Sequence, residues 1–153
     1  DAAYEAAVTQ AEWPARMQRL NTGLLGRIAP EAELWLDGGH NAAAGQALRA
    51  VLKDLSKRPT FLICGMLNTK DATGYLQPLA EQAQALIAVA IPGEENSLPA
   101  EELAAAARRA GLNADTADSF QDGLRAIVAD HPEARILICG SLYLAGEVLR
   151  ENE

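Results

Sequence analysis

Short apolar runs recur along the chain and alternate with segments of helical periodicity. The runs lie at residues 34–36, 61–64, 85–91 and 135–139, and they contain almost no polar side chains. Runs of this kind are typical of strands that other elements cover on both faces. An alternating segment at 16–20 and a weaker one near 113 are predicted as further short strands.

The segments between these runs place apolar residues three or four positions apart, as on one face of a helix. They predict helices over 41–55, 72–82, 99–110, from 119 onward and over 142–150. Residues 21–30 contain Gly23, Gly26 and Pro30 and are predicted as a loop or hairpin. The alternation of buried strands with helices predicts an α/β fold, a Rossmann-like three-layer sandwich whose mostly parallel sheet carries helices on both faces.

Composition narrows the class of protein. A chain of 153 residues fits one domain. The 13 Lys and Arg against 21 Asp and Glu give a net charge of −8, which argues against nucleic acid or an anionic membrane as a partner. No apolar run approaches the roughly 18 residues that cross a bilayer, and we expect a cytoplasmic protein. Cys64 and Cys139 are too few for a disulfide scaffold or a zinc site and are expected to be free thiols in the core.

The loop after the first buried run is the strongest candidate for chemistry, because ligands of α/β sheets bind at the carboxyl ends of strands. It contains Asp37, two glycines, His40 and Asn41. Asp37 is suited to accept hydrogen bonds from ribose hydroxyls, and His40 to donate one to a phosphate or carboxylate. The alternative is structural: Asp37 and Asn41 cap the next helix and His40 is an exposed loop residue.

Two further loops follow later strands. Lys70 is placed to meet an anionic substrate, or else it is solvated while Asp71 caps the following helix. Ser141 follows Gly140 and is suited either to contact a phosphate or to cap the last helix. The chain has no G-x-x-x-x-G-K-[ST] phosphate loop, no G-x-G-x-x-G fingerprint and no metal-ligand spacing, so a self-contained enzyme is hard to build from it, and we predict no metal ligands.

Four motifs occur in order along the chain: WPARMQ at 13–18, LDGGHN at 36–41, GMLNTKD at 65–71 and GSLYLAGE at 140–147. Together they resemble the C-terminal domain of bacterial folylpolyglutamate synthase/dihydrofolate synthase, within the Mur ligase superfamily. The resemblance implies a connector or helix end over 1–12 and a Mur ligase C-terminal-like domain over 13–153. The N-terminal ATPase domain of the family would lie outside this chain, which agrees with a first residue that is Asp1 rather than methionine.

The resemblance implies an ATP-dependent ligase that adds L-glutamate to dihydropteroate or tetrahydrofolate through an acyl phosphate. The implied cofactors are ATP and Mg²⁺, with the metal ligands mostly in the missing ATPase domain. This domain would close over the nucleotide in a monomeric enzyme and would be inactive alone. Its implied partners are therefore the ATPase domain and small molecules, namely ATP, the folate substrate and L-glutamate.

Site residues transfer position by position. Arg16 matches the arginine of the family's W-P-G-R segment, which contacts ATP, and Asp37 matches the nucleotide-binding aspartate of its D-x-A-H-N segment. His40 and Asn41 match the residues that follow and face the cleft, and His40 is the one candidate catalytic residue. Lys70 and Asp71 match a K-D pair in a cleft-facing loop. On this basis, Arg16→Ala or Asp37→Ala is expected to weaken ATP use far more than folding.

Two alternative functions stay open. The C-terminal domain of a cell-wall Mur ligase shares the fold and an analogous Asp/His loop, although the GSLYL ending favours the folate branch. A stand-alone, non-catalytic α/β binding module would also explain the missing phosphate loop. An upstream phosphate loop in the reading frame would separate the ligase from such a module.

Overall fold

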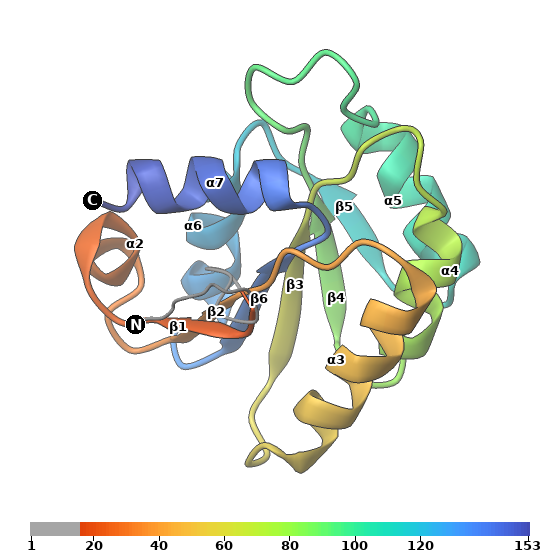
Figure 1. Ribbon diagram of the computed structural model, residues 1–153. Coiled ribbons are helices and arrows are strands. Elements are labelled where there is room, and N and C mark those ends of the chain that lie inside the picture. Colours follow the sequence, from red (N-terminus) through yellow and green to blue (C-terminus); the bar gives the residue numbers. More distant parts are fainter. Residues whose placement is uncertain (1–15) are drawn as a thin grey trace, which may run out of the picture.

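The computed structural model describes residues 16–153, in which six strands form one sheet in the order β1-β2-β6-β3-β4-β5 (Figure 1). The strands are β1 (Gln18–Leu20), β2 (Glu33–Leu36), β3 (Thr60–Cys64), β4 (Ala85–Ala88), β5 (Ala114–Thr116) and β6 (Arg135–Cys139). All neighbouring strands run parallel except β1, which is antiparallel to β2. The predicted mostly parallel α/β fold is confirmed. The connector expected over residues 1–12 lies outside the described residues.

Helices cover both faces of this sheet, as Figure 1 shows. The helices are α2 (Gly23–Ile28), α3 (Ala42–Asp54), α4 (Ala72–Leu76), the 3-10 helix η2 (Gln77–Leu79), α5 (Ala100–Arg109), α6 (Phe120–Asp130) and α7 (Leu142–Glu151). Buried side chains of α2, α6 and α7 pack into one core cluster, and those of α3, α4 and α5 into the other. The molecule therefore has the three layers that the sequence predicts. Among the described residues, no helix is long and apolar enough to cross a membrane.

The two central strands show why apolar runs without polar alternation become buried strands. In β6, Ile136 and Ile138 face the cluster of α2, α6 and α7, whereas Leu137 and Cys139 face the cluster of α3, α4 and α5. Successive side chains of a strand point to opposite faces, and here both faces are covered. Every residue of β3 and β6 is accordingly buried.

The prediction for residues 21–30 was wrong, because the segment contains helix α2 rather than a loop or hairpin. The cause lies at the other end of the chain. The Asn152 side chain accepts a hydrogen bond from the Leu25 backbone N–H (2.7 Å) and donates one to the Thr22 carbonyl (3.0 Å). Gly23 has a φ of +83°, and a Cβ there would lie 2.0 Å from the Asn152 carbonyl oxygen. Gly23, which suggests a loop in the sequence, is thus the residue that allows the C-terminal segment to pack closely against α2.

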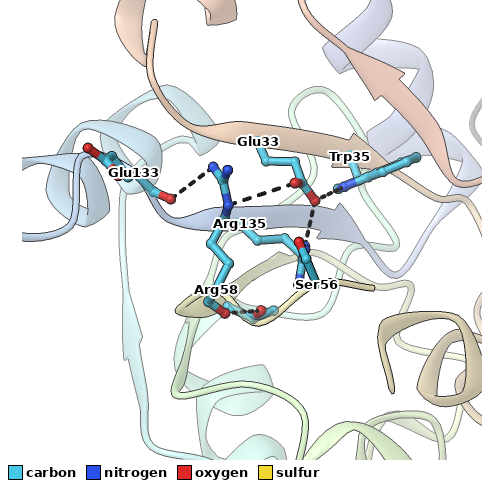
Figure 2. A network of polar contacts seen from close by, with 7 residues as sticks. Glu33, Trp35, Ser56, Arg58, Glu133 and Arg135 are labelled. Atoms are coloured by element: carbon cyan, nitrogen blue, oxygen red, sulfur yellow. Dashed lines mark hydrogen bonds and ion pairs between the residues drawn. The ribbon is translucent and has the colours of Figure 1, made fainter. Parts of the chain in front are cut away.

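A polar network around the buried Arg135 joins the amino ends of β2 and β6 (Figure 2). Arg135 is 3% exposed; it donates to the Glu33 carboxylate and to the Ser56 hydroxyl. Trp35 Nε1 also donates to Glu33 (2.7 Å), and Arg58 Nε lies 3.8 Å from Glu33 Oε1. Burial raises the pKa of Glu33, but the hydrogen bonds from Arg135 and Trp35 and the two guanidinium charges outweigh it and lower the pKa below 4.5.

Candidate functional site

A pocket of about 650 Å³ lies at the carboxyl end of β2, between the β2–α3 loop, α3 and the start of α7. It brings together four of the residues that the sequence singles out: Arg16, Asp37, His40 and Asn41. The rest of its lining is glycine and apolar: Met17, Gly38, Gly39, Ala43, Ala44, Ala47, Leu48, Val51 and Leu142. The pocket thus combines a polar loop with an apolar wall.

Asp37 holds the polar loop together. It is 6% exposed, and its Oδ1 accepts a hydrogen bond from the Met17 backbone N–H (2.9 Å) while Oδ2 accepts one from the Gly39 N–H (2.9 Å). Its carboxylate therefore joins the start of β1 to the β2–α3 loop and does not cap α3. Each carboxylate oxygen retains a second lone pair, so the group can still accept a hydrogen bond from a ligand.

Asn41 and His40 lie in the same loop but differ in their hydrogen bonding. Asn41 is the N-cap of α3, and its side-chain oxygen accepts from the Ala44 N–H (2.8 Å), which confirms the capping alternative for this residue. His40 is half-buried, and its Nδ1 is buried without a hydrogen-bond partner among residues 16–153. Buried polar atoms in proteins are nearly always satisfied. The His40 residue lines the pocket, but this ring nitrogen is itself enclosed by protein.

The two loop glycines make the pocket possible by allowing close contacts. A Cβ at Gly38 would lie 2.4 Å from Leu142 Cδ2, and a Cβ at Gly39 would lie 2.6 Å from the Ala44 Cβ. A side chain at Gly39 would push the loop away from α3, whereas one at Gly38 would require the Leu142 side chain to turn aside. Leu142 and Val51, which complete the apolar wall, are 40% and 39% exposed, and sequence reasoning did not identify them.

Lys70 and Asp71 lie in a different pocket, of about 380 Å³, between α4 and α5. Asp71 caps α4 by accepting from the Gly74 N–H (3.0 Å), and Lys70 is exposed. Glu102 and Arg109 of α5 line the same pocket. The structure therefore separates this pair from the Asp37 loop.

Ser141 is 3% exposed and lines neither of these pockets. Its hydroxyl accepts hydrogen bonds from the Tyr143 N–H (3.0 Å) and the Leu144 N–H (3.5 Å) as the N-cap of α7. This is the capping alternative that the sequence left open. The hydroxyl stabilises the helix start that presents Leu142 to the first pocket.

Cys64 and Cys139 are buried free thiols, as the sequence predicts. They lie directly opposite each other on β3 and β6. Contact with the Cys139 thiol and burial raise the pKa of Cys64 well above its usual value. A thiol held in the protonated form is a poor nucleophile, so packing describes these residues better than catalysis.

The fold and the first pocket define a Rossmann-like α/β domain with a pocket at the carboxyl edge of its parallel strands, the edge at which ligands of such sheets bind. The family model of the C-terminal domain of dihydrofolate synthetase matches residues 24–151, and the chain belongs to this family. The matched family belongs to folate metabolism, the branch that the GSLYL ending favours.

Named relatives agree with this assignment. The chain is 32% identical over 147 residues to a folylpolyglutamate synthase of Lacticaseibacillus casei, covering 91% of this chain and 33% of that protein. Among solved structures, it is similar to a Mycobacterium tuberculosis folylpolyglutamate synthase complexed with ADP and AMPPCP (TM-score 0.73, 28% identity, 95% of this chain and 33% of that one). It is also similar to E. coli FolC in complex with DHPP and ADP (TM-score 0.74, 26% identity, 90% and 31%). The chain thus spans about a third of the length of these relatives.

Proposed function

We propose that this chain is the nucleotide-closing domain of an ATP-dependent ligase that adds L-glutamate to dihydropteroate or tetrahydrofolate through an acyl phosphate. The observation that carries the proposal is the pocket that gathers Arg16, Asp37, His40 and Asn41. It occurs in a chain similar to two proteins whose solved complexes contain ADP.

The polar residues of the pocket are suited to the polar groups of a nucleotide. The Arg16 guanidinium offers a planar fork of donors suited to a phosphate group. Asp37 has acceptor capacity left for a ribose hydroxyl, and the His40 side chain, which lines the same pocket, is suited to hydrogen-bond a phosphate or carboxylate. The apolar wall of α3 residues and Leu142 is suited to the flat face of a base.

The half-exposed side chains at the pocket rim support a closing role. Val51 and Leu142 are partly exposed, and Tyr143, which follows Leu142 in the chain, is 59% exposed. We propose that the ATPase domain of the enzyme covers this rim and excludes water, which protects an acyl phosphate from hydrolysis. Within residues 16–153, no group of three His, Cys, Asp or Glu side chains is placed to hold a metal ion. We propose that the metal ligands lie mostly in the ATPase domain and that the isolated chain is inactive.

Titration of the 153-residue chain with ADP, followed by amide resonances in NMR spectra, tests the proposal. We expect shifts in the 37–41 loop. Arg16→Ala should weaken ADP binding by about tenfold or more, the loss expected for a charge-assisted hydrogen bond. Lys70→Ala is the matched control, because it removes an exposed cation of the other pocket and should leave ADP affinity unchanged. Shifts confined to the second pocket, or none with millimolar ADP, would contradict the proposal.

Sequencing the reading frame upstream of Asp1 gives an independent check. A phosphate loop of the G-x-x-x-x-G-K-[ST] type, between a strand and a helix, supports the ligase. A start codon directly before Asp1 would leave a stand-alone binding module instead.

A further inference from the structure

Met17 has an unusual backbone conformation at the entrance to the pocket. Its φ is +46°, and it is the only non-glycine residue with a positive φ in the described part of the chain. A residue with a Cβ pays a steric penalty in this left-handed region. Such a conformation persists only where the surrounding contacts determine it.

The contacts that hold Met17 are on both sides of it. Its N–H donates to Asp37 Oδ1 (2.9 Å), and the buried Asp37 carboxylate is fixed in turn by the Gly39 N–H. The next residue, Gln18, begins β1 and is paired with Leu36 of β2. Met17 is therefore the point at which the chain joins the sheet, fastened to the loop that forms the polar wall of the pocket.

The left-handed conformation of Met17 changes the face of the sheet on which Arg16 lies. Alternate residues of a strand share a face, so a strand continued back from β1 would place Arg16 on the face of Leu20. Leu20 packs with the cluster of α2, α6 and α7, whereas Arg19 lies 5.6 Å from the Trp35 ring, on the side of α3. Arg16 instead lines the pocket together with side chains of α3. The turn at Met17 accounts for this placement.

We propose that Met17 is a positioning residue: its left-handed backbone, fastened to Asp37, directs the Arg16 guanidinium into the nucleotide pocket. The inference rests on the proposed function for the identity of the ligand. It assigns the role to the backbone angle at this position and not to the thioether. Separate variants are therefore needed to test the effect of side-chain packing and the effect of the backbone angle.

Met17→Ile and Met17→Leu form a matched pair, because the two introduced side chains are isomers and differ only in branching at Cβ. A branched Cβ is especially unfavourable at positive φ. Met17→Gly complements them: glycine adopts the left-handed conformation readily but has no side chain to pack near Trp35. Thermal unfolding of each variant shows whether it is folded before any titration.

ADP titration of the 153-residue chain then tests the inference. We expect Met17→Ile to bind ADP about tenfold more weakly than Met17→Leu, as removal of the Arg16 contact would, and Met17→Gly to bind ADP more tightly than Met17→Ile. Adding Arg16→Ala to Met17→Ile should cause no further loss, because both changes remove the same contact. Wild-type affinity in Met17→Ile, equal weakening in Met17→Gly, or additive losses in the double variant would overturn it. A wild-type chain that does not bind ADP would instead refute the proposed function, and the inference with it.

Discussion

We expect the replacement of Gly45 by alanine to disturb the packing of two helices directly. Gly45 lies within α3, at the point where this helix packs on α4 and η2. A Cβ there would lie 2.2 Å from the Tyr75 carbonyl oxygen and 3.4 Å from Pro78 Cγ. The first of these neighbours is backbone, which cannot rotate away. Gly45→Ala therefore has to push α3 away from α4.

The magnitude follows from two opposing effects. Alanine in a helix interior is favoured over glycine by about 1 kcal/mol. Overpacking of a close contact costs about 1–3 kcal/mol, and a backbone neighbour at this distance places Gly45 at the upper end. We expect Gly45→Ala to lower the free energy of unfolding by about 2 kcal/mol.

Gly146→Ala is the control for this prediction. Gly146 is exposed within α7, and a Cβ there would meet no atom within 4 Å. Only the propensity effect remains, so this variant should be more stable by about 1 kcal/mol. Urea denaturation followed by far-UV circular dichroism measures both differences. If Gly45→Ala is as stable as Gly146→Ala, the close approach of α3 to α4 does not limit residue size and the reasoning fails.

Further predictions concern polar groups outside the pocket. Because the pKa of Glu33 lies below 4.5 in the folded chain, its contribution to stability should be lost as the pH falls from about 4.5 through that lowered value. Glu33→Gln should remove this part of the pH dependence of stability, measured in urea melts. It should also cost about 3 kcal/mol at pH 7, because Arg135 then lacks its charged partner. An unchanged acid slope would argue against the network. Asn152→Ala should cost about 1–2 kcal/mol and speed amide exchange at Leu25, with normal exchange there as the contrary result. The Tyr75 hydroxyl is fully buried and has no well-oriented hydrogen-bond partner among residues 16–153, so Tyr75→Phe should be neutral or up to about 1 kcal/mol more stable; a clear loss would reveal a partner.

Local sequence patterns were sufficient to predict most strands and helices, because each buried run or amphipathic segment indicates its own secondary structure. The helix predicted over 72–82 is an example: it forms as α4 followed by the 3-10 helix η2, which contains Pro78. Helix α2 was missed because its cap is supplied by Asn152, 127 residues away from Leu25. The strand order, with β6 between β2 and β3, is likewise a property of long-range packing that no local window contains.

The candidate site was predicted in part, for a similar reason. Residue types and spacing identify Asp37, His40 and Asn41 because they occupy one short loop, and the family resemblance adds Arg16 from a distant segment. No pattern in the sequence indicates that Met17 turns left-handed or that Leu142 reaches Gly38. These features arise where three separate segments meet. The separation of Lys70 and Asp71 into a second pocket also depends on how α4 packs against α5.

The geometry also changes how the two nucleotide-site variants should be compared. Arg16 is exposed, so Arg16→Ala removes donors without disturbing packing, and its effect on ADP binding reports the ligand contact. Asp37 is buried and accepts from two backbone N–H groups, so Asp37→Ala leaves both donors unpaired and releases Met17. Unpaired buried donors cost about 1–3 kcal/mol each, so we now expect Arg16→Ala, but not Asp37→Ala, to spare folding. A loss of affinity in Asp37→Ala therefore combines a lost acceptor with a misplaced Arg16, and only the arginine variant measures a single contact.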